Sequence, residues 1–242
     1  MLSHVEPRAS SQGTVSVVRV ANGERFVVKQ ASRAAIDRER RGLEAAAAVG
    51  GVPVVLAVPE PTVLVLSWQA GAASESPDAV RAAGGWLRQL HDRGRVQPDE
   101  LPLREALLRR RDAWLARATD LQVEAVAAAT FETFEGSSRA LCHRDFTPSN
   151  WLWAPERGLV VIDFGQARAD VAAWDLVKLE GDLFARQPSL REPFYEAYGA
   201  VDAAGLRDLM LLHGLQTAVW GDTHDDPAFS ALGRRLLRPT GY

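Results

Sequence analysis

Hydrophobic and polar residues alternate along the first thirty positions, and this alternation predicts β-strands. Val15 and Val17 lie two apart, and the apolar residues of the run that follows keep the same period, as in half-buried strands. Asn22-Gly23 separates the two runs and favours a two-residue hairpin turn, because both residues tolerate positive φ. We therefore expect three strands between residues 5 and 30.

The next segment predicts one helix and two further strands. Ser32 is a suitable N-cap, and the alanine- and leucine-rich run after it favours a helix to about Val49. Residues 54–58 and 62–68 are apolar runs of strand length, separated by a short turn that contains two prolines. Together these elements predict a five-stranded antiparallel sheet with one helix.

Helical periodicity dominates from Pro77 onward. Residues 79–92 keep their apolar positions on one face, and Gly94 marks the expected end of that helix. Residues 139–142 turn extended, and 159–162 form a hydrophobic strand. The remaining helices are expected at 103–121, 123–134, 170–187, 190–199, 203–221 and 226–237.

These elements predict an α+β fold of two lobes. The N-terminal lobe is expected to span residues 1–68, and the polar, small-residue stretch 69–76 is expected to be a linker. Residues 77–242 then form a mainly helical C-terminal lobe, in a chain long enough to hold two lobes.

Composition narrows the class of protein. The 242 residues are 47% hydrophobic and 24% charged, as in soluble globular proteins, and a net charge of −3 gives no basic footprint for nucleic acid. Cys142 is the only cysteine, so neither a disulfide framework nor a cysteine-based zinc site is expected. Residues 1–13 lack the apolar core of a signal peptide, and no apolar run is long enough to span a bilayer. We therefore expect a cytoplasmic protein.

Three oxygen-bearing side chains occur at fixed offsets in the second half of the chain. Asp145 is followed after five residues by Asn150, and thirteen residues later by Asp163. Oxygen ligands suit a hard cation such as Mg²⁺, which keeps part of its coordination for water and substrate phosphates. Upstream, Lys29 ends a predicted strand and is one of only two lysines among 28 basic residues, which suggests that a compact point charge is needed there.

The two motifs that carry these residues, His143-Arg144-Asp145 with Asn150 and Asp163-Phe164-Gly165, are similar to the catalytic loop and metal-binding triplet of the protein-kinase-like fold. The segment after Gly165 is too short for the peptide-docking platform of a protein kinase, and it contains no A-P-E motif. It reaches Trp174-Asp175-Leu176 within ten residues. The chain therefore resembles the aminoglycoside phosphotransferase and choline kinase-like family.

The resemblance implies a role for each motif residue, with ATP and Mg²⁺ as cofactors. Asp145 would orient the acceptor hydroxyl or accept its proton, and Asn150 and Asp163 would hold Mg²⁺. His143 would be a scaffold residue of the loop, and Asp175 would support the loop from beneath. One departure is Arg144, where most small-molecule kinases of this group have glycine, and we expect it to pair with a nearby carboxylate.

Nucleotide-binding residues are expected in the first seventy positions. Lys29 would reach the phosphates, and a helix glutamate would hold it by charge pairing. We favour Glu39 over Glu44, because its spacing to Val52-Pro53 is similar to that of the helix glutamate in this family. The turn that contains Ser11 and Gly13 could lie over the phosphates, although a plain hairpin turn is the alternative. Backbone groups near Ser67 and Gln69 would contact the adenine edge.

The acceptor is expected to be a small molecule with a hydroxyl group. A cationic acceptor such as an aminoglycoside would be met by carboxylates, although for each of them an ordinary solvated charge is the favoured interpretation. The cluster from residue 222 to 226, with Trp220 beside it, is the first choice for the acceptor rim. The carboxylates considered are Asp170, Asp182, Glu192, Glu196, Asp222, Asp225 and Asp226.

Three classes of function stay open at this stage. The first is an ATP-dependent small-molecule O-phosphotransferase, acting either in antibiotic resistance or on a metabolite such as a sugar or amino alcohol. A protein kinase and a non-catalytic nucleotide-binding module are the alternatives. Neither nucleic acid nor membrane is expected as a partner, and the sequence does not decide between a monomer and a homodimer.

Overall fold

The computed structural model describes residues 2–10, 13–96, 101–119, 121 and 123–238, and these form two compact units. The first contains Met1–Val96, Ala140–Ala169 and Ser189–Gly199, and the second contains Gln97–Arg139, Asp170–Pro188 and Ala200–Tyr242. The first unit thus contains the segment that carries Asp145 together with the N-terminal sheet, and the expected lobe boundaries stay a prediction.

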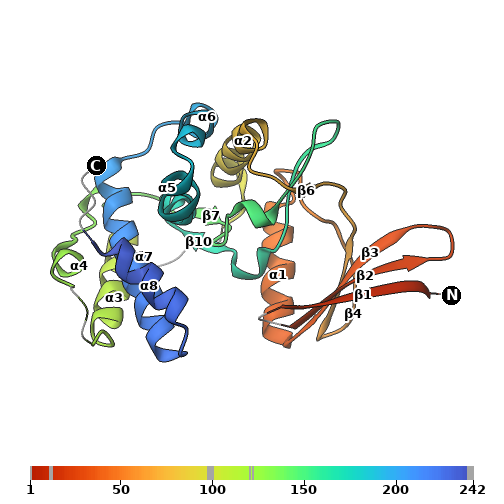
Figure 1. The fold of residues 1–242 in the computed structure, drawn as a ribbon, viewed down its shortest axis with the longest axis horizontal. Helices are drawn as coiled ribbons and strands as arrows, with labels where there is room; N and C mark the ends of the chain where they lie inside the picture. Colours follow the sequence, from red (N-terminus) through yellow and green to blue (C-terminus); the bar gives the residue numbers. More distant parts are fainter. Residues whose placement is uncertain (1, 11–12, 97–100, 120, 122, 239–242) are drawn as a thin grey trace. The chain divides into compact units, whose positions relative to one another are not determined.

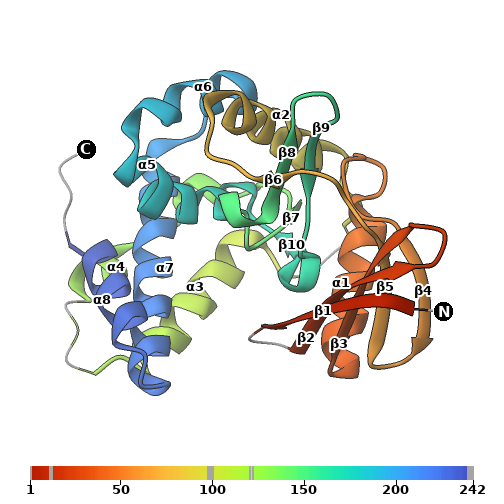
Figure 2. The same ribbon diagram turned by 45° about the vertical axis from the view of Figure 1, so that its right-hand side comes forward.

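The first unit contains the predicted five-stranded antiparallel sheet and its helix. The strands are β1 (Leu2–Ser10), β2 (Gly13–Val20), β3 (Arg25–Ala31), β4 (Val55–Glu60) and β5 (Val63–Ser67), in the spatial order β1-β2-β3-β5-β4. Helix α1 (Arg33–Ala46) lies against one face of this sheet (Figure 2). It begins as predicted at Ser32, whose side-chain oxygen accepts a hydrogen bond from the Ala35 N–H at 3.3 Å.

Helices α2 and α6 complete this unit together with a small sheet. Helix α2 (Pro77–Arg93) is capped by Ser76 and ends at Gly94 as predicted, and α6 (Arg191–Tyr198) packs beside it. The short strands are β6 (Ala72–Ala73), β7 (Ala140–Cys142), β8 (Trp151–Ala154), β9 (Gly158–Val161) and β10 (Arg168–Asp170). Strands β6, β8 and β9 form one sheet, and the β8–β9 hairpin carries the chain from the Asp145 loop to the Asp163 loop.

The second unit is mainly helical. Helices α7 (Ala203–Thr223) and α8 (Pro227–Leu236) lie side by side (Figure 1), because glycine at position 233 lets α8 approach the α7 backbone closely. Helices α3 (Leu103–Leu115), α4 (Glu124–Ala128) and α5 (Phe184–Arg186) complete the α-helical part. Among the described residues, no helix has both the length and the apolar character needed to cross a membrane.

Three of the expected helices are wrong in this unit, and the first of them, 103–121, already ends at Leu115. The predicted helix 123–134 stops at Ala128, because Phe131 is fully buried with a left-handed backbone at φ 52°. The Phe131 N–H donates to the Asp208 carboxylate at 3.2 Å, so a tertiary contact outweighs local helix propensity. The predicted helix 170–187 is instead a 3-10 helix at Ala172–Leu176, a π-helical turn at Leu179–Leu183 and then α5.

Two tryptophans of the first unit differ in how their indole N–H groups are satisfied. The Trp86 Nε1–H donates to the Gly50 carbonyl at 2.9 Å. Trp151 is fully buried, and its Nε1 has no hydrogen-bond partner among the described residues. An unpaired buried donor costs free energy in the folded state, whereas a paired one stabilises it.

We therefore expect Trp86→Phe to be more costly than Trp151→Phe. Both changes remove similar ring volume, but only the first breaks a hydrogen bond, the one from the Trp86 indole to the Gly50 carbonyl. Urea unfolding should show a difference between the two variants of about 1–2 kcal/mol in the free energy of unfolding. An equal or larger loss for Trp151→Phe would contradict the assignment of its indole N–H as unpaired.

Candidate active site

The loop between β7 and β8 holds Asp145 by hydrogen bonds from two directions. The Asp145 N–H donates to His143 Nδ1 at 3.3 Å. Asn150 Nδ2 donates to the Asp145 backbone carbonyl at 2.8 Å and to its Oδ2 at 3.2 Å. The five-residue spacing noted in the sequence therefore closes a compact loop, in which the Asp145 carboxylate is oriented and half-buried.

His143 connects this loop to the segment that carries Asp163. It is fully buried, and its Nε2–H donates to the Ile162 carbonyl at 2.9 Å. The Ile162 carbonyl can only accept, and the Asp145 N–H at Nδ1 can only donate. These two partners therefore require the His143 tautomer that is protonated at Nε2. His143 thus links the backbone of Asp145 to the residue that precedes Asp163.

An aromatic layer lies beneath both loops, and sequence reasoning missed it. Phe146 and Phe164, the residues after the two aspartates, are buried and pack edge-on to the His143 ring, with centroid distances of 6.0 and 4.7 Å. Trp86 of α2 stacks on Phe146 at 5.9 Å and meets Phe164 edge-on at 6.3 Å. The available signal was the shared Asp-Phe pair in the two motifs.

Lys29, Glu39 and Asp163 converge from three different elements. Lys29 Nζ of β3 lies 2.5 Å from Glu39 Oε1 of α1 and 3.3 Å from Asp163 Oδ1 after β9. Burial alone would lower the pKa of Lys29, but the attraction of the two carboxylates outweighs it and raises that pKa. Glu44, the alternative partner, instead forms an ion pair with Arg40 at 2.7 Å.

Two residues of the motifs have a left-handed backbone that is uncommon outside glycine. Arg144 has φ 67°, and Asp163 has φ 66° and ψ 67°. Such a conformation costs a non-glycine residue on the order of 1 kcal/mol and persists where surrounding contacts determine it. For Arg144 it gives a physical reason why glycine suits this position, independent of what the arginine side chain contacts.

Asn150 and Asp163 offer oxygen donors that suit a hard divalent cation. The Asn150 side chain is buried, and its Nδ2 is occupied by the Asp145 oxygens, which orients the amide and leaves its oxygen as the candidate ligand. The Asp163 carboxylate remains half exposed to solvent beside Lys29. An oxygen-only donor set of this kind fits Mg²⁺ better than a metal that prefers nitrogen or sulfur.

The other residues expected to bind the nucleotide, in the Ser11–Gly13 turn and at Ser67 and Gln69, differ in what the structure shows of them. Ser11 lies outside the described residues. Gly13 begins β2, where a Cβ atom would lie 2.0 Å from the Gln30 carbonyl oxygen, so the close approach to β3 requires glycine. The Ser67 N–H already donates to the Val54 carbonyl at 2.9 Å, and Gln69 Nε2 donates to Ser67 Oγ at 2.6 Å.

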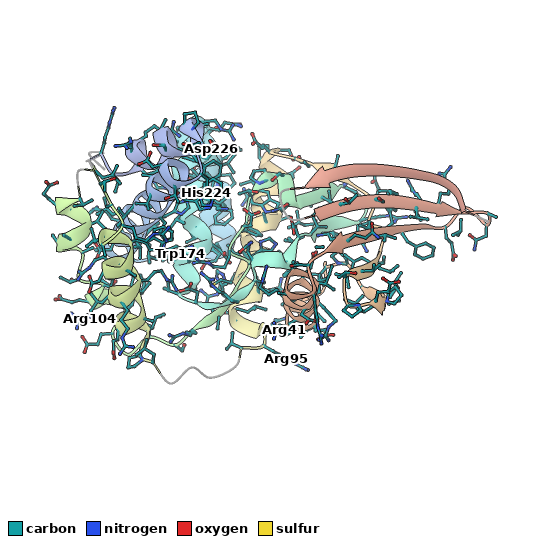
Figure 3. The ribbon with its side chains drawn as sticks, turned by 90° about the horizontal axis from the view of Figure 1, so that it is seen from below. Arg41, Arg95, Arg104, Trp174, His224 and Asp226 are labelled. Carbon is teal, nitrogen blue, oxygen red and sulfur yellow. The ribbon has the colours of Figure 1, made fainter. Side chains whose placement is uncertain are left out.

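Asp170 and Asp175 are both buried in the second unit. The Asp170 carboxylate pairs with Arg110 at 3.0 Å and accepts the Val171 N–H at 2.9 Å. Arg110 also lies over the ring of Trp174, which Figure 3 labels, at 4.8 Å. These contacts make Asp170 part of the packed interior and argue against the expected role in acceptor binding.

The acidic cluster expected to form the acceptor rim lies where α7 passes into α8, with His224 and Asp226 at the same end of the helix pair (Figure 3). Asp222 pairs with Arg234 at 2.9 Å, and Asp226 caps α8 by accepting the Ala228 and Phe229 N–H groups. Asp225 is exposed in the connecting turn. Much of the charge of this cluster is therefore used within the protein.

Trp220 is exposed beside this cluster rather than buried in the core. Forty per cent of its surface is accessible, and the His224 ring stacks on it at 4.3 Å. Phe229 of α8 packs against the same indole at 5.1 Å. The tryptophan therefore belongs to a surface aromatic group.

A model of the phosphotransferase enzyme family matches residues 4–212, and the chain belongs to this family. The family confirms a two-lobed, protein-kinase-like fold and a phosphotransferase with an alcohol group as acceptor, as the motifs predicted. A sequence search of curated proteins finds no match.

Solved structures with the same fold act on several kinds of small molecule. The chain is similar to a choline/ethanolamine kinase family protein from Mesorhizobium loti, with 21% identity and a TM-score of 0.71 over 97% of this chain and 86% of that one. A choline kinase from Streptococcus pneumoniae is 14% identical, with a TM-score of 0.73 over 98% of this chain and 93% of that one. A macrolide 2'-phosphotransferase from Brachybacterium faecium is 16% identical, with a TM-score of 0.68 over 100% of this chain and 94% of that one.

We expect Lys29→Met to destabilise the fold, because it leaves the buried Glu39 carboxylate beside Asp163 without a cation. Breaking a buried ion pair from one side should lower the free energy of unfolding by about 3 kcal/mol. The double variant Lys29→Met/Glu39→Gln should recover part of that loss, since the buried negative charge is then removed.

The control is Arg40→Met, which breaks the more exposed pair with Glu44 on the same helix. That change should cost less than about 1 kcal/mol. Equal losses for Lys29→Met and Arg40→Met in urea unfolding would show that the pair is solvated rather than buried.

Proposed function

We propose that the protein transfers the γ-phosphoryl group of ATP to a hydroxyl group of a small molecule. The observation that supports this most directly is that one compact unit contains both an oriented carboxylate, Asp145, and a buried lysine beside a second aspartate. Asp145 is oriented as a proton acceptor by His143 and Asn150, and the Lys29–Glu39 pair reaches the aspartate that follows β9.

In this proposal Asp145 acts on the acceptor. Its carboxylate accepts the proton of the acceptor hydroxyl while the hydroxyl oxygen bonds to the γ-phosphorus. The bond between that phosphorus and the β–γ bridging oxygen breaks, and ADP leaves with the bridging oxygen. The hydrogen bonds to the Asp145 backbone and to Oδ2 hold the carboxylate in place, so little rearrangement is needed.

The remaining motif residues serve the nucleotide. Lys29 is held by Glu39 and supplies a positive charge for the phosphates, and Asn150 and Asp163 are the oxygen donors that would hold Mg²⁺. When bound, the metal would offset phosphate charge as the γ-phosphoryl group moves. Because the Ser67 N–H is already used by Val54, we assign the adenine edge chiefly to the backbone of Gln69.

The proposed acceptor is an alcohol, and the acidic cluster does not indicate whether that alcohol is cationic or neutral. Asp222 and Asp226 are occupied by their own contacts, so of the proposed rim Asp225 is the best placed to meet a cation. The exposed Trp220 ring offers an apolar face beside it. An aminoglycoside-like acceptor and a sugar or amino alcohol of metabolism both fit this surface.

A protein substrate is disfavoured by the path of the chain after Asp163. Residues 164–176 fold into two 3-10 helices joined by β10, and Phe164, Asp170 and Trp174 in this stretch are buried. Such a segment offers no extended platform for a peptide. A non-catalytic module would not need an oriented carboxylate at Asp145.

Replacing Asp145 by asparagine should separate catalysis from nucleotide binding. The side chain keeps its shape but loses the proton acceptor, so kcat should fall by roughly 10²–10⁴. Calorimetry should show Mg-ATP affinity close to that of the unchanged protein. Asp78→Asn, at an exposed position in α2, is the control and should leave both quantities unaltered.

Replacing Asp163 by alanine should instead affect nucleotide binding. It removes a candidate metal ligand and one of the two carboxylates beside Lys29, so Mg-dependent ATP binding should be lost by calorimetry. Retention of that binding would remove Asp163 from the proposed metal site.

A screen of ATP consumption over matched acceptors would identify the substrate class. Aminoglycosides, neutral sugars and amino alcohols should be compared at equal concentration with Asp225→Asn as a second enzyme form. A cationic acceptor should lose affinity in this variant while a neutral one should not. If no alcohol stimulates ATP consumption by a protein that binds Mg-ATP, the proposed transfer is wrong.

A further inference from the structure

Helix α1 approaches the loop after Asp163 at a position where no side chain fits. Gly42 is buried, and a Cβ atom there would lie 2.9 Å from the Phe164 carbonyl oxygen and 2.9 Å from the Ala167 Cβ. Glycine inside a helix costs about 1 kcal/mol relative to alanine, so this position sacrifices helix stability for contact with the loop. An isolated glycine in an otherwise alanine-rich helix was the available sequence signal.

Arg38 holds the same loop from one turn earlier on the helix. Its Nε–H donates to the Gly165 carbonyl at 3.4 Å. Positions 38 and 42 are four residues apart and therefore share one face of α1. Glu39, the partner of Lys29, lies between them in the sequence and is buried on the same helix.

The backbone around Asp163 is thus fixed on both sides. The preceding carbonyl, that of Ile162, accepts from His143, and the carbonyl of Gly165 accepts from Arg38. Phe164 between them is fully buried, with the His143 ring at 4.7 Å on one side and Gly42 on another. Asp163 has a left-handed backbone, which is uncommon outside glycine, and these contacts can hold it in that conformation.

We propose that Arg38 and Gly42 are positioning residues for Asp163, so that α1 sets the places of the phosphate-binding lysine and the metal-binding aspartate together. This inference rests on the proposed function, since it concerns the metal that Asp163 would hold. Neither residue touches the reacting atoms. Their effect reaches the metal through the Asp163 backbone, as outer contacts of metal ligands commonly do.

Arg38→Met tests the hydrogen bond, with Arg38→Lys as its conservative partner. Without the donor, the Mg²⁺ concentration that gives half-maximal ATP binding should rise roughly tenfold or more in calorimetry without acceptor. Lysine can still donate to the Gly165 carbonyl and should recover part of the affinity. Arg41→Met is the matched control, because Arg41 is exposed like Arg38 (Figure 3), but its Nε–H donates to the Asp37 carbonyl within the helix instead of to the loop.

Gly42→Ala tests the close approach, with Gly85→Ala in α2 as its control. The added methyl group at position 42 must displace Phe164 or Ala167, whereas at position 85 it meets only the Ala197 Cβ at 3.9 Å. Hydrogen exchange of the metal-free protein should therefore become faster for amides 163–167 in Gly42→Ala and in Arg38→Met. It should remain unchanged there in Gly85→Ala and Arg41→Met.

The outcomes separate this inference from the proposed function. If the unchanged protein shows no Mg-dependent ATP binding, the proposed function fails. If it binds Mg-ATP but Arg38→Met and Gly42→Ala behave like their controls in both measurements, the positioning inference is overturned and the proposed function stands. Should Gly42→Ala fail to fold, the Arg38 series decides the question alone.

Discussion

A lysine ammonium group that is largely removed from water must be surrounded by negative charge, and the first compact unit is built to meet that requirement at Lys29. Only 16% of this side chain is accessible, and its two carboxylate partners come from α1 and from the segment after β9. The sheet, the helix and the β8–β9 hairpin are therefore tied together at one cation. The same charge that stabilises the fold is the one proposed to meet the phosphates of ATP.

The two aspartates are supported from beneath by shared apolar and hydrogen-bonded contacts. His143 joins the backbone of Asp145 to that of Ile162, and the phenylalanine after each aspartate packs against the same imidazole ring. A neutral histidine in one tautomer suits this place, because one nitrogen must accept and the other must donate. The segments that carry Asp145 and Asp163 thus hold one another, although they are separated by a hairpin in the sequence.

Much of the fold follows from local sequence signals. The alternating strands, the Ser32 cap and the Gly94 helix end are confirmed by the structure, because each depends on nearby residues. The expected helix over 123–134 is wrong because the burial of Phe131 and its bond to Asp208 depend on residues far along the chain. The breaks in 170–187 likewise have no clear local signal.

The candidate site shows the same division. Motif spacing brought forward the residues that the structure groups around Asp145 and Lys29, and helix spacing favoured Glu39, which the structure pairs with Lys29. Spacing says nothing about whether a carboxylate is already satisfied, so the ion pair of Asp170 with Arg110 and the capping role of Asp226 could not be foreseen. Arg38 and Gly42 were missed because their role comes from a contact across the fold.

In mechanical terms, α1 and the loop after Asp163 are packed at Gly42 without a gap between them. A helix that rotated or slid to withdraw Glu39 from Lys29 would have to push through the Phe164 backbone or carry it along. If Lys29 and Asp163 have the roles proposed above, such a movement of α1 would disturb both residues at once.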